Sequence, residues 1–197
     1  MNVAIMASSA GSGKDTVADY IVEKLHNGNA VKHSLGSSIH ELAEQFATEK
    51  VERHHLQDLG ESVRSIFGHE TWIHLLDRET KDLNVPLIIP DVRKLLEYSH
   101  YCVERGFKPL YVYTSSDVAK ARLNDRDGGF KQSDLERNIE LQMTFLQDET
   151  MNTIGNNGLC KIDMPYPFNE IYVVNNSGAL DKTYRQLDDW WEIINEK

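Results

Sequence analysis

The stretch that most constrains the fold is residues 2–16, near the start of the chain. An apolar run over residues 2–7 predicts a strand, a loop of small residues follows it, and a helix is expected to begin at Lys14. Gly11 and Gly13 allow the loop to curl tightly, because glycine has no Cβ that could clash. A strand, a glycine-rich loop and a helix that carries lysine form the pattern of a phosphate-binding loop, or P-loop.

Such a loop binds phosphate through its backbone and its lysine. The N–H groups of the loop converge on an anion, and the N-terminus of the following helix adds a partial positive charge. The ammonium of Lys14 would reach the β- and γ-phosphates of a nucleotide. Two residues depart from the usual pattern. Ser8 stands where it opens with glycine, and Asp15 stands where a Mg²⁺-binding serine or threonine normally follows the lysine.

The loop therefore supplies a set of candidates for nucleotide and metal binding. The candidate nucleotide-binding residues are Ala10, Gly11, Ser12, Gly13, Lys14, Asp15 and Thr16. Of these, Asp15 or Thr16 is expected to hold Mg²⁺. The alternative is a plain glycine-rich turn with a solvent-exposed lysine.

Strand and helix patterns alternate along the rest of the chain. Apolar runs predict five strands, over residues 2–7, 30–35, 85–89, 109–114 and 170–174. Strands that alternate with helices indicate a parallel sheet with right-handed crossovers. We therefore expect an α/β, three-layer P-loop NTPase fold with a central parallel five-stranded sheet, helices on both faces, and a single domain spanning the whole chain.

The segments between the strands give more local predictions. Ser37 or Ser38 is expected to cap a helix. Residues 116–127 and 131–148 are expected to form helices, and residues 150–168 to be irregular. The two tryptophans of the last helix lie at core spacing and are expected to pack rather than to take part in chemistry.

Composition limits the classes of function. The chain has 197 residues, 40% of them hydrophobic as in an ordinary soluble domain, and a formal net charge of −10. This negative charge argues against non-specific nucleic-acid binding. The apolar N-terminal run is too short to span a membrane, and Cys102 and Cys160 fit free thiols in a reducing compartment. We expect a cytoplasmic protein that acts on a small molecule; the oligomeric state is open, with a homodimer among the alternatives.

Arginines near the strand ends are informative, because ligands of a parallel sheet bind beyond the carboxyl ends of the strands. Phosphoryl transfer needs positioning, a metal and cations where charge accumulates. Arg64 follows Gly60 by one helical turn and could clamp an acceptor phosphate with two nitrogens of its guanidinium. The alternative is a surface arginine that pairs with Glu61, three residues earlier.

Asp91 and Arg93 follow the apolar third strand directly. An unpaired charge is costly at such an interior place, which favours a functional role for the pair. The carboxylate could hold Mg²⁺ through water or accept a hydroxyl of the substrate. Alternatively, Arg93 anchors Asp91 structurally.

Arg122 and Arg126 lie four residues apart on one face of an expected helix, and Gly128 and Gly129 follow as a hinge. A closing lid, here expected over about residues 122–148, requires cations that reach the transferring phosphate and exclude water. The alternative is a solvated helix end with Arg–Asp pairs.

Together these motifs resemble phage-type deoxynucleoside monophosphate kinases, of the kind encoded by T-even phages. The features in family order are Ser12-Gly13-Lys14-Asp15-Thr16, Val17-Ala18-Asp19-Tyr20, Ala30-Val31-Lys32 before Leu35, Leu56-Gln57-Asp58-Leu59-Gly60 with Trp72 downstream, and Ile89-Pro90-Asp91-Val92-Arg93 with Glu97. They cover residues 2–115 well and the C-terminal third in outline. Gly-Lys-Asp-Thr is itself typical of this family, so the unusual Asp15 supports the resemblance.

The resemblance implies ATP- and Mg²⁺-dependent transfer of the γ-phosphoryl group to a (deoxy)nucleoside 5′-monophosphate, in nucleotide biosynthesis and, for a phage protein, in the host cytoplasm. The residues implied to be catalytic are Lys14, Arg93, Arg122 and Arg126. Those implied to hold the metal are Asp15, Thr16 and Asp91.

The resemblance also implies an acceptor site built on helices over about residues 36–83. The implied acceptor-binding residues are Ser37, Gly60, Arg64, Trp72, Asp91 and Arg93. Trp72 would either stack on a base or pack in the core. The chain is shorter than the T-even proteins between residues 46 and 56, which leaves the acceptor specificity open.

Two other classes of function remain as alternatives. Dephospho-CoA kinases and animal-type phosphomevalonate kinases share the fold group and parts of the motifs, although the usual Gly-Lys-Ser-Thr of a dephospho-CoA kinase is absent here. A switch would bind or hydrolyse NTP without an acceptor. Against it, residues 175–178 read Asn-Asn-Ser-Gly rather than a guanine-reading Asn-Lys-x-Asp, and a switch has no obvious use for the arginine-rich lid.

Overall fold

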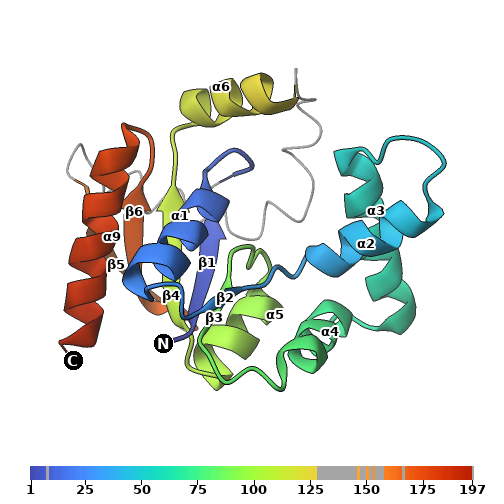
Figure 1. The fold of residues 1–197 in the computed structure, drawn as a ribbon, viewed down its shortest axis with the longest axis horizontal. Coiled ribbons are helices and arrows are strands. Elements are labelled where there is room, and N and C mark those ends of the chain that lie inside the picture. The colour runs from blue at the N-terminus through green and yellow to red at the C-terminus, as the bar shows by residue number, and fades with distance from the viewer. Residues whose placement is uncertain are drawn as a thin grey trace.

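The computed structural model of the chain describes residues 1–7, 9–127, 146, 150, 153, 158–165 and 167–196 (Figure 1). The described strands are β1 (Val3–Ala7), β2 (Val31–Lys32), β3 (Leu87–Ile89), β4 (Lys108–Tyr113), β5 (Cys160–Met164) and β6 (Asn169–Asn175). The described helices are α1 (Lys14–Tyr20), α2 (Ser37–Phe46), α3 (Arg53–Phe67), α4 (Thr71–Thr80), α5 (Leu95–Tyr98), α6 (Ser116–Asp127) and α9 (Leu180–Asn195). Two π-helical segments, η1 (Ile21–Leu25) and η2 (Ser99–Glu104), continue α1 and α5.

The described strands form one sheet in the order β2-β3-β1-β4-β6-β5. Neighbouring strands are parallel from β2 to β6, whereas β5 pairs with β6 in the antiparallel direction. The parallel sheet is thus confirmed, with its five strands at the expected places. The total of five is wrong, because residues 160–164, which were expected to be irregular, form a sixth strand at the edge.

The sixth strand carries an alternating pattern that is too short to stand out. Cys160, Ile162 and Met164 belong to or pack against the core, and Lys161 and Asp163 between them are exposed. The strand pairs with β6 in a register that places Ile162 opposite Ile171. Five alternating residues are weak evidence for a strand within a segment rich in glycine, asparagine and proline.

Helices cover both faces of the sheet, as the expected three-layer fold requires (Figure 1). On β1, Val3 and Ile5 face one core, in which Trp190 of α9 is fully buried. Ala4 and Met6 face the other core, which includes residues of α4, α5 and η2. A fully buried large apolar side chain contributes about 1.5–3 kcal/mol to stability. The packing role predicted for the tryptophans of the last helix is therefore confirmed for Trp190.

Two further local predictions can be compared with the described residues. Helix α6 covers residues 116–127 as expected, whereas the helix expected over residues 131–148 lies almost wholly outside the described residues. The predicted serine cap is wrong, because Gly36 occupies the cap position and no side chain caps α2. Ser37 instead donates through its hydroxyl to the carbonyl oxygen of Ser34, at 2.6 Å.

The parallel strands bring their carboxyl ends to one edge of the sheet, where the loops after β1, β2, β3, β4 and β6 lie. Helix α6 lies over this edge, and α2 and α3 stand to one side of it (Figure 1). This edge gathers the loops that carry most of the predicted site residues. Within the described part of the chain, no helix has the length and apolar character that crossing a membrane would require.

Candidate active site

The loop between β1 and α1 depends on its two glycines. Gly11 and Gly13 have φ angles of 79° and 80°, in the left-handed region that favours glycine, and Gly13 is the cap residue of α1. A Cβ on Gly11 would lie 2.5 Å from the carbonyl oxygen of Ala119 in α6. A Cβ on Gly13 would clash with the amide nitrogen of Asn176. Conformation and packing therefore both require glycine at these positions.

The carbonyl oxygen of Ser12 is held by donors from other loops. It accepts hydrogen bonds from the side-chain amide of Asn176 at 2.7 Å and from the hydroxyl of Thr114 at 2.9 Å, with Nη1 of Arg122 at 3.4 Å. Asn176 is fixed in turn, because the hydroxyl of Thr183 donates to its side-chain oxygen at 2.8 Å. These contacts join the P-loop to β4, α6 and α9, and they fix the orientation of one of its peptide groups.

Sequence analysis gave neither Thr114 nor Asn176 a role in the site. The signal was their position at the exits of β4 and β6. Arg122, predicted as a lid cation, donates through Nη2 to the backbone oxygen of Asn176 at 2.9 Å. Arg126, one turn further along α6, is exposed. The rest of the expected lid, over residues 128–148, lies almost wholly outside the described residues.

The P-loop also presents polar groups that could meet a ligand. Within the described residues, the hydroxyls of Ser9 and Ser12 are buried without a hydrogen-bond partner. The ammonium of Lys14 lies 2.7 Å from the carboxylate of Asp15, and their side chains are 20% and 62% exposed. Thr16 is exposed one residue further along α1. Buried hydroxyls beside an accessible ammonium suit an anion better than a cation.

Asp91, directly after β3, braces the loop between β2 and α2. Its buried carboxylate accepts hydrogen bonds from the hydroxyl of Ser34 at 2.6 Å and from the backbone N–H groups of Leu35 and Gly36 at 2.8 and 2.9 Å. Three protein donors thus contact this carboxylate already. Its predicted contact with Mg²⁺ or a substrate hydroxyl stays a prediction.

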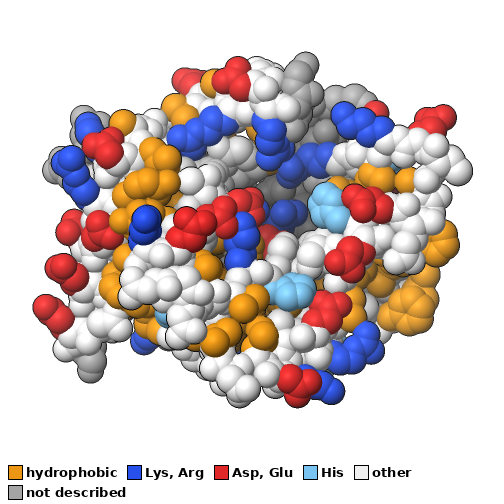
Figure 2. All heavy atoms as spheres, in the orientation of Figure 1, with side chains coloured by type: hydrophobic (Ala, Val, Ile, Leu, Met, Phe, Trp, Pro, Cys, Tyr) orange, Lys and Arg blue, Asp and Glu red, His pale blue; other side chains and the backbone are white. Residues whose placement is uncertain are grey.

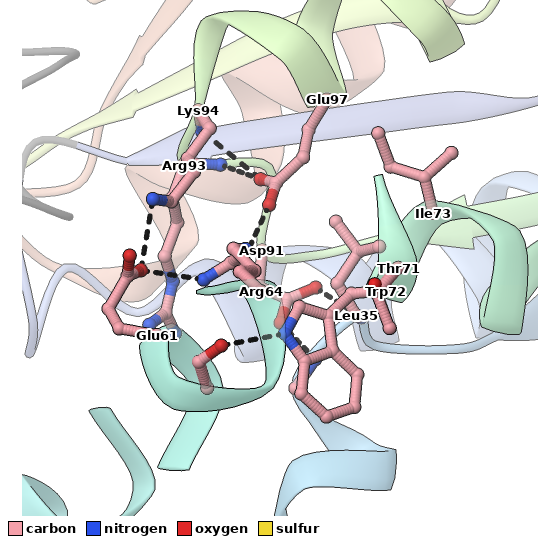
Figure 3. A network of polar contacts seen from close by, with 12 residues as sticks. Leu35, Glu61, Arg64, Thr71, Trp72, Ile73, Asp91, Arg93, Lys94 and Glu97 are labelled. Atoms are coloured by element: carbon pink, nitrogen blue, oxygen red, sulfur yellow. Dashed lines mark hydrogen bonds and ion pairs between the residues drawn. The ribbon is translucent and has the colours of Figure 1, made fainter. Parts of the chain in front are cut away.

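Arg64 is buried rather than on the surface, with 4% of its side chain exposed. Nη1 donates to Glu61 at 2.7 Å, and Nη2 donates to Glu97 at 3.1 Å. The side chain of Lys94 lies 2.9 Å from the same oxygen of Glu61 (Figure 3). We call Glu61, Arg64, Lys94 and Glu97 the Arg64 cluster. The pairing with Glu61 is the one that sequence analysis gave as an alternative, but Glu97 adds a buried partner.

Glu97 holds both the side chain of Arg64 and the backbone turn after β3. Its second oxygen accepts hydrogen bonds from the backbone N–H groups of Arg93 and Lys94, at 2.8 and 3.1 Å. Burial raises the pKa of Glu97, while these N–H groups and the guanidinium of Arg64 oppose the rise. Its oxygens accept hydrogen bonds from three N–H donors, which is the environment that favours an ionised carboxylate.

The pKa of Glu61 moves in the opposite direction. Burial alone would raise it, but the hydrogen bonds and charges of Lys94 and Arg64 outweigh burial and hold the pKa below its ordinary value. Glu61, Lys94 and Glu97 were not among the predicted site residues. The available signal was Glu97, four residues after Arg93 and already part of the family resemblance.

The remaining predicted acceptor residues lie outside the Arg64 cluster. Trp72 is 4% exposed, and its indole N–H donates to the carbonyl oxygen of Gly60 at 3.2 Å. This is the core position given as an alternative, and in this conformation the ring offers no open face to a base. Ser37 lies at the start of α2, with its hydroxyl 3.4 Å from Nδ1 of His33. Arg93 is half-buried beside the cluster.

The candidate residues thus fall into two groups at the ends of neighbouring strands. The P-loop follows β1, Asp91 and the Arg64 cluster adjoin the end of β3, and these two strands pair directly. Figure 2 shows this face hollowed near its centre, between α6 and the α2–α3 pair, with Lys and Arg side chains around the hollow. In the described ranges, no group of three or more His, Cys, Asp or Glu side chains is arranged to hold a metal by itself.

Comparison with solved structures identifies this arrangement of elements. The crystal structure of a gluconokinase from Sinorhizobium meliloti matches with a TM-score of 0.54 and 14% sequence identity, over 98% of this chain and 95% of that chain. The fold of the present chain is therefore similar to that of a kinase. TT1252 from Thermus thermophilus matches with the same TM-score and 19% identity, over 99% of this chain and 97% of that one. No protein-family model and no curated protein sequence matches the chain.

Proposed function

We propose that the chain transfers the γ-phosphoryl group of ATP to a deoxynucleoside 5′-monophosphate and releases the diphosphate. The observation that carries this proposal is that two groups of residues with cationic side chains lie at the ends of the adjacent strands β1 and β3. One is the P-loop with Lys14, and the other is the Arg64 cluster. Two anionic substrates that bind side by side are what a phosphoryl transfer between nucleotides requires.

The donor half fits the phosphates of ATP. The buried, unpartnered hydroxyl of Ser12 and the N-terminus of α1 at Gly13 offer donors to an anion, and Lys14 adds a charge. Asp15 and Thr16, exposed in the first turn of α1, are the residues that would hold Mg²⁺. When bound, Mg²⁺ neutralises charge on the phosphate oxygens. Mg²⁺ usually takes few protein ligands beside phosphate and water, so these two residues would hold it together with the nucleotide.

The acceptor half would hold the phosphate of the monophosphate. Arg64 and Arg93 supply cations near the end of β3, and Asp91 keeps the loop before α2 in place. Arg122 anchors the P-loop and would stabilise the transferring group together with Arg126. These roles deliver orientation and charge to the reacting phosphates, which supply most of the catalysis in this chemistry.

A different small-molecule acceptor is the main alternative. The similarity to the fold of a gluconokinase makes gluconate one acceptor to test, because the same cations could bind its carboxylate. Dephospho-CoA and phosphomevalonate carry phosphate groups and fit the same charge. A nucleotide switch without an acceptor is weaker, because it gives the Arg64 cluster no purpose.

A coupled assay of ADP release separates these candidates. The protein would be incubated with ATP and Mg²⁺ alone, and then with each deoxynucleoside monophosphate, ribonucleoside monophosphate, gluconate, dephospho-CoA and phosphomevalonate. We expect release of ADP that depends on a deoxynucleoside monophosphate. Release that is independent of any acceptor would favour the switch, and release with gluconate alone would replace the nucleotide acceptor by a sugar acid.

A further inference from the structure

One carboxylate oxygen in the Arg64 cluster lies between two cations. Oε1 of Glu61 accepts a hydrogen bond from Nη1 of Arg64 at 2.7 Å and lies 2.9 Å from Nζ of Lys94 (Figure 3). The cations come from separate elements, since Arg64 belongs to α3 and Lys94 caps α5. Two cations that converge on one oxygen form an anion site, and here a side chain of the protein fills it.

The carboxylate that fills the site is far more exposed than the cations. The side chain of Glu61 is 51% exposed, compared with 4% for Arg64 and 15% for Lys94. On its other side, Arg64 is secured by Glu97, which is 5% exposed. Glu61 can therefore rotate into solvent, while Glu97 keeps Arg64 in place and the two cations need a new anion.

Electrostatics favours an anion of higher charge than a carboxylate. A phosphate monoester carries a charge of about −1.5 to −2 near neutral pH and has three acceptor oxygens, so separate oxygens can contact the two cations. The lowered pKa of Glu61 agrees with the geometry, because it reports that Lys94 and Arg64 stabilise negative charge at this point. A phosphate would gain from the same field without holding a side chain in one rotamer.

We propose that Arg64 and Lys94 form the subsite for the phosphate monoester of the acceptor, and that Glu61 is its resident counterion, displaced when the acceptor binds. The identity of the acceptor rests on the proposed function, whereas its charge class rests on the cluster itself. Glu61 thus acts as an internal competitor that lowers the affinity for anions of low charge. It also keeps Arg64 paired when the site holds no substrate.

The test measures phosphate binding apart from the P-loop. Inorganic phosphate is titrated calorimetrically into protein with Lys14→Ala, which removes the lysine of the other phosphate site. In this background, Glu61→Gln is expected to lower the Kd about tenfold, because the competing charge is gone, and Lys94→Met to raise it about tenfold. The control is Glu170→Gln, which removes the same charge from an exposed pair with Lys161 and should leave the Kd within about twofold.

The outcomes separate this inference from the proposed function. A Kd unchanged by both Glu61→Gln and Lys94→Met overturns the subsite, whatever the protein phosphorylates. The expected changes in Kd without any kinase activity would refute the proposed function and leave the subsite standing. Gluconate is titrated in parallel, and binding tighter than that of phosphate would overturn the assignment to a phosphate monoester. Circular dichroism checks folding, and Lys94→Gln, which also removes the charge and should raise the Kd, replaces Lys94→Met if that variant does not fold.

Discussion

The P-loop and the Arg64 cluster lie at the ends of neighbouring strands, yet different interactions hold them. Around the carbonyl oxygen of Ser12 the close donors are neutral side chains, Thr114 and Asn176. Gly11 packs against the backbone of α6, and Gly13 packs against the side chain of Asn176. Around Arg64 the partners are the carboxylates of Glu61 and Glu97. One half of the candidate site is held by neutral hydrogen bonds and close packing, and the other by opposite charges.

This difference determines how each half responds to its surroundings. Neutral hydrogen bonds and steric packing change little with salt or near neutral pH. The P-loop should therefore keep one shape, which suits the unvarying phosphates of the proposed phosphoryl donor, ATP. The ion pairs of the half-exposed Glu61 respond to salt, pH and any competing anion. The proposed exchange of this carboxylate for a ligand uses that response, and the P-loop backbone has no such exchange to make.

The largest effect is expected from the one strong cation of the P-loop. Lys14→Ala should lower kcat/KM with ATP and the best acceptor about 10²–10⁴-fold, by analogy with the loss of other charge-stabilising groups. Its fold should persist, since the ammonium of Lys14 pairs with Asp15, an exposed neighbour in the sequence. Steady-state kinetics and a melting curve measure the two effects. Lys24→Ala, an exposed lysine on η1, is the control; near-normal turnover in Lys14→Ala would contradict the donor assignment.

Breaking the charged scaffold should destabilise the protein by about 3 kcal/mol. Glu97→Gln removes a buried charge, leaves Arg64 with the half-exposed Glu61, and places an amide against the backbone N–H groups of Arg93 and Lys94. Urea denaturation measures the loss. Glu170→Gln, at an exposed pair, should cost less than about 1 kcal/mol. Equal losses in the two variants would mean that burial adds nothing to this ion pair.

Breaking the neutral scaffold should cost about 1–3 kcal/mol, because a buried acceptor and donor lose a partner. Asn176→Ala removes the amide that binds the carbonyl of Ser12 and leaves the hydroxyl of Thr183 without its acceptor. We expect a higher KM for ATP and a stability loss that is the same at low and high salt. Glu61→Gln, which removes the half-exposed carboxylate of the Arg64 cluster, should be the salt-sensitive variant when measured in parallel. A salt-dependent loss in Asn176→Ala would remove the contrast between the two halves.

Features that are local in sequence were predictable, and contacts between distant segments were not. The P-loop and the five parallel strands follow from short apolar runs and glycines. The burial of Arg64 depends on Glu97, 33 residues later, and the support of Ser12 depends on Asn176, 164 residues later. An i−3 carboxylate predicts one partner for Arg64, as found, but its exposure is decided by how α3 packs against the turn after β3. Strand β5 was missed for a different reason, since its local alternation of Cys160, Ile162 and Met164 with polar residues spans only five positions.

The smallest predicted effect is the dependence of stability on pH through Glu61. Its pKa is lowered in the folded protein, so its ion pairs add stability above the ordinary pKa of a glutamate, and that gain is lost as the pH falls through the lowered value. Because Glu61 is half-exposed, the gain should be below about 1 kcal/mol. Urea denaturation of the wild type and Glu61→Gln at neutral and acidic pH would measure it. We expect the wild type to be slightly more stable at neutral pH and the difference to vanish in acid. If the wild type instead became more stable relative to Glu61→Gln as the pH falls, burial rather than Lys94 and Arg64 would control the pKa of this carboxylate.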